Sequence, residues 1–322
     1  MKIKFLTVAL TILVCSSELI FGQTADGKCG ATGGNQNCGT QFCCSQFGFC
    51  GNTVDHCGTG CQPSFGKCGT GTAPPANSTT PTNPGTSTPA VEITTCSKSG
   101  TVAITFDDGP SQFTSTLLDK LKVDNFKATF FINGNNGGCI YDNAEVVKRA
   151  FNEGHQIASH TWSHQDLATL NKDQIKYQMK KLEEALVKIL GVKPVYMRPP
   201  FGSGVDKPLV MSTLGELGYK VVTWDIDTND WQGRSTSECL NEYRNASPPP
   251  KPHIALNHDT IKNTATNMAP QAFKIMKSRG FKINTVGECL GVTDPTKWYI
   301  KVGAPQTRDN TWVCKDSDIT GP

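Results

Sequence analysis

The stretch Thr105-Phe106-Asp107-Asp108-Gly109-Pro110 defines the first strand end of a predicted larger domain. It follows the apolar run 102–104, which is typical of a buried strand, and its Gly-Pro pair predicts a turn directly afterwards. Neighbouring side chains at a strand end point in different directions, so two adjacent carboxylates there can serve two purposes. One can bind a metal ion while the other moves a proton. The alternative is an ordinary turn in which an aspartate only caps the next helix.

The length and charge of the chain restrict its class. Its 322 residues suit two unequal domains, and its net charge of +3, with both signs well mixed, indicates neither a nucleic-acid partner nor a membrane surface. The basic start Met1-Lys2-Ile3-Lys4, the apolar run 5–15 and small residues near Gly22 form the pattern of a signal peptide, which we expect to span residues 1–22. Neither a second long apolar segment nor a hydrophobic C-terminal tail follows. We therefore expect a soluble, secreted monomer that is extracellular or associated with a cell wall.

Cysteine usage agrees with an oxidising compartment. Of fourteen cysteines, Cys15 leaves with the signal peptide, so thirteen remain. Eight of these lie between Cys29 and Cys68, and the other five are scattered: Cys96, Cys139, Cys239, Cys289 and Cys314. An odd total requires at least one free thiol or an intermolecular disulfide.

Residues 28–68 form a small segment with many Gly and Asn and almost no aliphatic side chains. Such a segment cannot bury enough core to fold alone, so disulfides must hold it together. Phe47 and Phe49 have no core to enter and are predicted to be displayed side by side. Exposed flat rings suit the apolar faces of sugars, although a toxin-like structural scaffold is the alternative.

The cysteine spacing of this segment, with adjacent Cys43 and Cys44 followed by Ser-Gln-Phe-Gly-Phe-Cys-Gly, resembles hevein-type chitin-binding modules. The resemblance implies four disulfides: Cys29–Cys44, Cys38–Cys50, Cys43–Cys57 and Cys61–Cys68. It also implies a sugar site made of Ser45, Phe47, Phe49 and His56. The chain departs from the usual pattern, since Trp or Tyr is more common at the aromatic positions and Tyr is common at position 56. We expect the module to bind chitin, with an affinity that the sequence leaves open.

Residues 69–95 are rich in Pro, Thr and Ser and are predicted to form an extended tether. Their hydroxyls suit O-glycosylation and Asn77 begins an N-glycosylation sequon, while a second sequon at Asn245 is weakened by Pro248. A flexible tether between a sugar-binding module and a larger domain raises the local substrate concentration without fixing geometry.

From Gly100 onward, strand-like and helix-like segments alternate. The predicted strands are 102–106, 128–132, 156–159, 195–197, 219–224, 253–256 and 282–283. The predicted helices are 115–123, 143–152, 172–190, 207–217, 237–245 and 267–279, and 172–190 has the clearest helical periodicity. Repeated strand–helix units predict an α/β fold with a parallel sheet, either open or closed into a barrel. In such folds the chemistry collects at the C-terminal ends of the strands.

Polar clusters follow several of these strands. His160 and His164 come after 156–159, and their spacing places two metal ligands on one face if the segment turns helically. With an aspartate they make a two-His, one-carboxylate set that leaves a position open for water or substrate. Arg198 follows 195–197 and can hold a carboxylate through a bidentate contact. Further clusters at 225–231 and 257–259 contain acids, a Trp and His258; each cluster alone can also be capping or surface residues.

In order, the clusters 105–110, 160–164, 198–202, 227–231 and 254–259 resemble the five motifs of the polysaccharide deacetylase, or NodB-homology, family of carbohydrate esterases. The resemblance spans roughly residues 100–290 and implies an irregular (β/α) barrel. It also implies a zinc ion, sometimes replaced by cobalt or another divalent ion, with three protein ligands: Asp108, His160 and His164.

The resemblance implies further roles around the metal. Asp107 is the expected general base, oriented by Arg198. His258 is the expected general acid, tuned by Asp230. The expected substrate contacts are the backbone N–H of Phe201 for the oxyanion, Trp231 as a groove wall and Leu256 in the acetyl pocket. Phe201 stands where Tyr is more usual, which matters little if only its N–H is used.

The two resemblances together predict an enzyme that hydrolyses the N-acetyl groups of chitin, giving chitosan and acetate. The alternatives are the same chemistry on peptidoglycan or acetylxylan, or a chitin-binding lectin with an inactive barrel.

Fungal members of the family suggest a disulfide between Cys96 and Cys289. Cys139, Cys239 and Cys314 cannot be paired from the sequence. The deacetylase domain is predicted to span 96–290, and the extension 291–322, with Trp298, Tyr299 and Trp312, is predicted to pack against it.

Overall fold

The computed structural model describes residues 28–30, 35–39, 42–46, 48–51, 54–58, 60–68 and 88–320. The predicted signal peptide, most of the predicted tether, the Asn77 sequon and Phe47 lie outside these residues. The chain separates into two compact units, Met1–Pro84 and Gly85–Pro322.

Disulfides hold the smaller unit together, as its lack of aliphatic residues requires. The bonds are Cys29–Cys44, Cys38–Cys50, Cys43–Cys57 and Cys61–Cys68, which confirms all four predicted pairs. Strand β1 (Cys43–Cys44) runs antiparallel to β2 (Cys50–Gly51), beside the short helix α1 (Val54–Cys57) and the 3-10 turn η2 (Pro63–Phe65). The buried apolar cluster of the described part of this unit consists of cysteines alone, with Phe42 and Phe65 packed partly against it.

The larger unit is built on a parallel sheet with strand order β10-β11-β4-β5-β6-β8-β9-β3, and β12 pairs with the first residues of β4. The strands are β3 (Glu92–Ile93), β4 (Thr101–Asp107), β5 (Thr129–Ile132), β6 (Gln156–Ser159), β8 (Tyr196–Met197), β9 (Lys220–Val222), β10 (Ile226–Asp227), β11 (His253–His258) and β12 (Lys282–Asn284). Within the described residues the end strands β10 and β3 do not pair with each other. The sheet is therefore an irregular, incompletely closed barrel, which confirms the predicted fold class.

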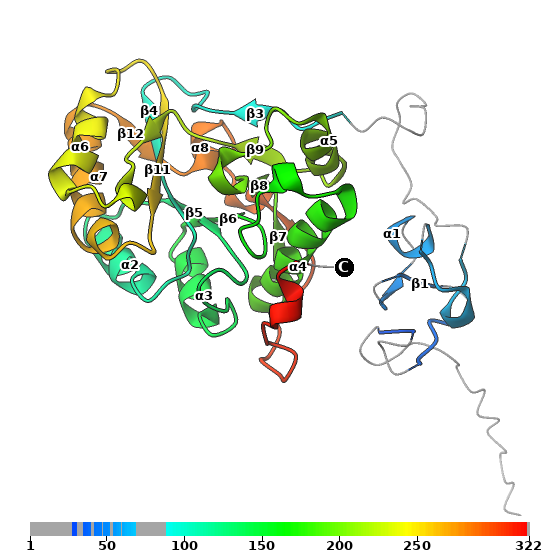
Figure 1. The fold of residues 1–322 in the computed structure, drawn as a ribbon. Coiled ribbons are helices and arrows are strands. Elements are labelled where there is room, and N and C mark those ends of the chain that lie inside the picture. The colour runs from blue at the N-terminus through cyan, green and yellow to red at the C-terminus, as the bar shows by residue number, and fades with distance from the viewer. Residues whose placement is uncertain are drawn as a thin grey trace, which may run out of the picture. The chain divides into compact units, whose positions relative to one another are not determined.

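Helices lie around the strands (Figure 1). They are α2 (Thr114–Val123), α3 (Ala144–Asn152), α4 (Lys172–Leu190), α5 (Pro208–Glu216), α6 (Thr236–Asn245), α7 (Ala269–Ser278) and the short α8 (Val286–Cys289). Helix α4 has the predicted bounds because Asn171 and Gln174 form a capping box at its start and Gly191, with φ +76°, ends it. A π-helical turn, η6 (Thr264–Met268), precedes α7, and only its last two residues fall within the predicted helix 267–279. None of the helices in the described part is both long and apolar enough to cross a membrane.

Strand β4 shows how the sheet positions polar groups. Its residues are all buried. Val102, Ile104 and Phe106 pack with the outer helices, whereas Ala103 belongs to a separate cluster with Phe131. Because side chains alternate along a strand, Thr105 and Asp107 share the face of Ala103 and point into the barrel. The strand therefore ends with a carboxylate inside the barrel.

Two segments correct the predictions. Glu92–Ile93, predicted to be tether, pairs in parallel with β9, and the Thr223 hydroxyl donates to the Glu92 carboxylate. The predicted tether end at residue 95 therefore lies inside the folded unit. The predicted strand 219–224 is shorter in the structure, where β9 spans Lys220–Val222. Strand β10, which was not predicted, follows it and pairs with β11.

The chain beyond residue 290 packs against the larger unit, as predicted. Strand β13 (Tyr299–Lys301) runs antiparallel to β7 (Val192–Pro194), and Trp298 and Trp312 are both buried. The tail is therefore part of the folded unit.

The remaining cysteines are also accounted for. The predicted Cys96–Cys289 disulfide is confirmed. A further bond, Cys139–Cys314, joins the tail to the loop before α3, and Cys239 is a buried free thiol. Of the thirteen cysteines outside the predicted signal peptide, twelve are therefore paired and Cys239 is the free thiol that an odd total requires.

Candidate active site

Three potential metal ligands converge beyond the ends of β4 and β6. Nε2 of His164 lies 3.2 Å, and Nε2 of His160 3.5 Å, from Oδ1 of Asp108. This carboxylate oxygen is buried and has no hydrogen-bond partner among the described residues. A buried oxygen without a donor is costly, and a cation between the three side chains would satisfy it. Two imidazoles and one carboxylate are a donor set that suits a divalent metal ion.

The segment that carries the two histidines is not helical, so they do not meet in the way that their spacing would allow on a helix. Thr161 and His164 have φ of +72° and +55°, and the resulting tight loop brings the two rings to 4.9 Å. Asp108 also has positive φ, at +73°. Each such conformation costs a non-glycine residue roughly 1–2 kcal/mol, so surrounding contacts must hold it.

A backbone contact orients His160. Its Nδ1 lies 2.7 Å from the carbonyl oxygen of Arg198. A carbonyl only accepts, so Nδ1 carries the proton and the lone pair of Nε2 faces Asp108. Burial lowers the pKa of His160 to about 3, so the ring is neutral, as a metal ligand must be.

Arg198 is fully buried beneath Asp107. Its Nη1 donates to Oδ1 of Asp107 and to the Thr105 hydroxyl, both at 2.7 Å, and its other nitrogens donate to carbonyl oxygens at the end of β9. The predicted bidentate contact is therefore wrong, because the guanidinium divides its donors between one carboxylate oxygen and the barrel wall. Oδ2 of Asp107 remains free of Arg198 and lies 3.7 Å from Nε2 of His160.

The surroundings of Asp107 suit a base. Burial raises the pKa of Asp107, although the charge and hydrogen bond of Arg198 act in the opposite direction. The ring of Phe131 stacks 4.1 Å from the guanidinium carbon and helps to exclude water from the pair. A carboxylate whose pKa is raised by burial is a better proton acceptor than an exposed aspartate.

His258 lies beside Asp107, because the two are register partners on the parallel strands β11 and β4. Oδ1 of Asp230 accepts from Nδ1 of His258 at 2.7 Å, and Oδ2 accepts from the His258 backbone N–H and the Thr264 hydroxyl at 2.9 and 2.7 Å. Burial alone would lower the pKa of His258, but the hydrogen bond and charge of Asp230, with the charges of Asp107 and Asp108, raise it to about 9. The ring is therefore protonated at neutral pH and presents Nε2–H as an acid.

Two large aromatic side chains from the predicted motifs are exposed. Phe201 is 67% and Trp231 60% exposed, and the Phe201 ring meets His164 edge-on at 4.5 Å. Leu256 is buried and shares a face of β11 with His258, two residues later. The structure thus brings the predicted ligands, the acid–base residues and Phe201 to the ends of neighbouring strands.

One buried carboxyl of the predicted cluster 257–259, that of Asp259, was assigned no role from the sequence. Asp259 accepts a hydrogen bond from the Thr114 hydroxyl, and burial raises the pKa of Asp259 to about 7. Its carboxylate lies against Gly109, where an added Cβ would come within 2.5 Å of both oxygens. The glycine after Asp108 is therefore needed for close approach, and the Asp-Asp-Gly sequence was the available signal.

The predicted sugar site of the smaller unit is partly described. Phe49 is 42% exposed, and its backbone N–H donates to the hydroxyl of the buried Ser45. His56 lies against Gly51, where an added Cβ would be 2.5 Å from the ring. Because Phe47 lies outside the described residues, the pair of exposed rings stays a prediction.

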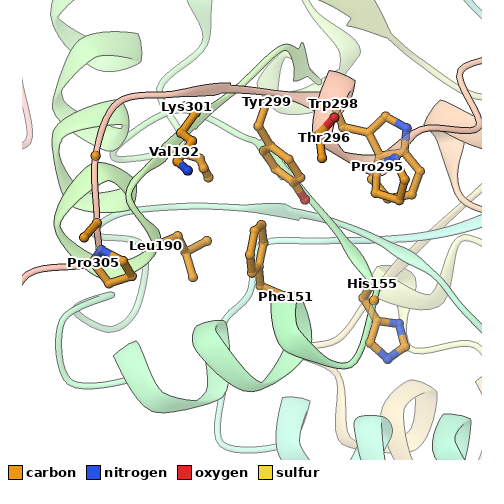
Figure 2. Close-up of a pocket in the computed structure, with 13 residues that line it drawn as sticks. Phe151, His155, Leu190, Val192, Pro295, Thr296, Trp298, Tyr299, Lys301 and Pro305 are labelled. Atoms are coloured by element: carbon orange, nitrogen blue, oxygen red, sulfur yellow. The ribbon is translucent and has the colours of Figure 1, made fainter.

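An apolar cavity of about 670 Å³ lies apart from this site (Figure 2). Its lining includes Phe151, Leu190, Val192, Tyr299 and His155, which precedes β6. The histidine ligands follow β6, so the cavity and the candidate metal site lie at opposite ends of that strand.

The chain is similar to known proteins over both units. The polysaccharide deacetylase family matches residues 94–222, and the chitin recognition protein family matches residues 28–68. A chitin deacetylase from Pestalotiopsis sp. is 43% identical over 243 residues, which are 70% of this chain and 80% of that protein. A probable peptidoglycan-N-acetylglucosamine deacetylase from Arthroderma benhamiae is 44% identical over 215 residues, 64% of this chain and 47% of that protein. The solved structure of the chitin deacetylase from Colletotrichum lindemuthianum has a TM-score of 0.64 and 36% identity, covering 66% of this chain and 97% of that one.

Proposed function

Because the chain belongs to the polysaccharide deacetylase family, we propose that it is a zinc-dependent chitin deacetylase that releases acetate and leaves chitosan. The observation that carries this proposal is the arrangement around Asp108, His160 and His164. A base candidate, Asp107 with Arg198 beneath it, lies on β4, and an acid candidate, His258 with Asp230 behind it, ends the neighbouring strand. Hydrolysis of an amide needs both, since water must lose a proton and the amine must gain one.

We assign the metal-ligand role to Asp108, His160 and His164. When bound there, a divalent ion would polarise the acetyl carbonyl and acidify a water molecule. Zinc suits this donor set, and cobalt or another divalent ion can replace it.

Proton transfer, oxyanion binding and substrate contacts are assigned to residues of the chain itself. Asp107 accepts the proton of the attacking water through Oδ2, which Arg198 leaves free. The backbone N–H of Phe201 donates to the developing oxyanion. Nε2–H of His258 donates to the departing nitrogen, while Asp230 keeps the other ring nitrogen protonated. Trp231 and Leu256 are assigned to the groove wall and the acetyl pocket.

The substrate assignment rests on the smaller unit and on the relatives. The match to the chitin recognition family, with the exposed Phe49, supports a module that retains the enzyme on chitin. Two of the relatives compared act, by their names, on chitin. Peptidoglycan is the second candidate substrate, because the Arthroderma benhamiae relative is named for it and shares the N-acetylglucosamine unit. The predicted signal peptide and the disulfides support secretion.

Acetate release from chitin oligomers and from peptidoglycan, each with and without a chelator, tests the proposal. We expect chelator-sensitive release that is faster on chitin oligomers and is restored by zinc. Activity that survives complete removal of metal would refute the metal assignment. Faster release from peptidoglycan would transfer the substrate assignment to the second candidate.

A further inference from the structure

The loop that carries both histidine ligands is held from outside by three separate parts of the chain. Asn133 donates through its side chain to the carbonyl oxygens of His160 and Thr161. The backbone N–H groups of Gly134 and Asn135 donate to the carbonyl of residue 162, at 2.8 and 2.6 Å. The loop 133–139 is therefore the first of these supports.

Packing between these two loops is close. Trp162 is fully buried, and a Cβ added at Gly134 would lie 1.9 Å from its ring. The buried Gln178 of α4 is the second support. Its backbone carbonyl accepts from the Trp162 N–H at 3.0 Å, and its side-chain Oε1 accepts from the Ser163 N–H at 2.9 Å.

The third support is the C-terminal tail. The carbonyl oxygen of Ile319 accepts from the Ser163 hydroxyl at 2.6 Å and from Nε2 of Gln178 at 2.8 Å. Asp318 pairs with Lys181 of the same helix at 3.5 Å. Ser163 stands directly before His164, so the tail contacts the ligand loop itself.

A disulfide links two of the three supports covalently. The Cys139–Cys314 disulfide joins the loop 133–139 to the tail, and Trp312 is buried against Tyr141 with ring centroids 5.5 Å apart. The ligand loop is therefore enclosed between the loop 133–139, α4 and a tail that is bonded to that loop. The tail lies outside the residues 94–222 that match the deacetylase family.

We propose that residues 311–319 form a C-terminal brace that positions His160 and His164 for the metal ion. The loop has positive φ at Thr161 and His164, a conformation that needs external support. The brace supplies it through Ser163 and through the disulfide. Ser163 and Ile319 are positioning residues, and the proposal rests on the metal site proposed above.

The test measures metal binding directly. Apo protein is titrated with zinc against a chromophoric chelator, and with cobalt, whose visible absorption reports ligand geometry. The variant Cys139→Ser/Cys314→Ser should bind either ion at least about tenfold more weakly than wild type, because supports of metal ligands typically contribute 10–100-fold to affinity. Its cobalt spectrum should also change.

The matched control is Cys96→Ser/Cys289→Ser. Its disulfide spans 193 residues, against 175 for Cys139–Cys314, so both variants relieve a similar constraint on the unfolded chain. We expect both to lose thermal stability and only the Cys139/Cys314 variant to lose metal affinity. Equal metal affinity in the two variants would show that the brace is a general stabiliser and would overturn the proposal.

A second variant keeps every disulfide. Ser163→Ala removes the hydroxyl that reaches the tail and should weaken metal binding severalfold, whereas Ser278→Ala, which removes an exposed hydroxyl bonded to its own helix, should not. Wild-type affinity in Ser163→Ala would count against the brace. A wild-type protein that binds neither ion would instead overturn the proposed function, and the brace with it.

Discussion

Replacing Asp230 by Asn should move the pH range in which the enzyme works. The carboxylate of Asp230 accepts from both Nδ1 and the backbone N–H of His258, and it is the main reason that the pKa of His258 rises to about 9. Without that charge, burial should lower the pKa of His258 towards its ordinary value of 6.5, while the charges of Asp107 and Asp108 still act against this fall. A fall of the pKa from about 9 to 6.5 corresponds to roughly 3 kcal/mol, which is the upper bound of the effect.

The rate effect follows from the protonated fraction of His258. At pH 8, a group of pKa 9 is about 91% protonated and a group of pKa 6.5 about 3%, so the loss of protonated His258 should lower acetate release by up to about 30-fold. Below pH 6, where His258 is largely protonated in both proteins, the rate difference should narrow to the part caused by the lost orientation of His258. The assay is kcat against pH for zinc-loaded wild type and Asp230→Asn on a chitin oligomer. An alkaline limb that stays near pH 9 in the variant would refute the assignment of His258 as the acid.

The same pair makes a stability prediction. A histidine with a raised pKa in the folded state stabilises the protein below its unfolded pKa, and the contribution is lost as pH rises through its folded pKa. The unfolding free energy of wild type should therefore exceed that of Asp230→Asn most below pH 6.5, and the gap should close towards pH 9. Denaturant titrations at several pH values measure this difference.

The matched control is Asp225→Asn. Asp225 accepts from Nδ1 of His253 at 2.6 Å and from the backbone N–H of Ile254 at 2.8 Å, at the start of the same strand and far from the metal ligands. It should lower stability without moving the alkaline limb of the rate profile. A shift of that limb in the control would show that the effect is not specific to the acid.

Three shorter predictions test other parts of the molecule. His164→Ala should abolish zinc binding and acetate release while leaving retention on chitin beads unchanged. Phe49→Ala should weaken retention on chitin beads while leaving zinc binding and acetate release unchanged, and a pull-down combined with an activity assay distinguishes the two effects. Gly109→Ala should lower the unfolding free energy by about 1–3 kcal/mol and weaken zinc binding, because the added Cβ meets a carboxylate at 2.5 Å, and thermal denaturation with metal titration measures both. Arg198→Lys should lower kcat/KM at least about 100-fold, since a single ammonium cannot serve Asp107, Thr105 and the two carbonyls at once; an unchanged kcat/KM would contradict the role given to this buried residue.

Local sequence patterns were sufficient to predict a secondary-structure element where the segment is long or has a clear apolar pattern. The periodic apolar residues of 172–190 predicted α4 to the residue, and the apolar run before Asp107 predicted β4. The two-residue strands β3 and β10 were missed, because a segment that short has no periodicity and its pairing partners lie far away in the sequence. The resemblance to hevein-type modules, which the cysteine spacing carries, predicted every disulfide of the smaller unit.

The sequence by itself determined which residue types stand at the strand ends, and the order of parallel strands made it reasonable to expect them together. The separate placement of Asp107 and Asp108 was decided by tertiary structure, because Arg198 reaches one from within the barrel and positive φ turns the other towards the histidines. The same holds for the non-helical turn of the ligand loop and for the Cys139–Cys314 bond. These features depend on contacts between residues that are distant in the chain, and local sequence patterns cannot predict such contacts.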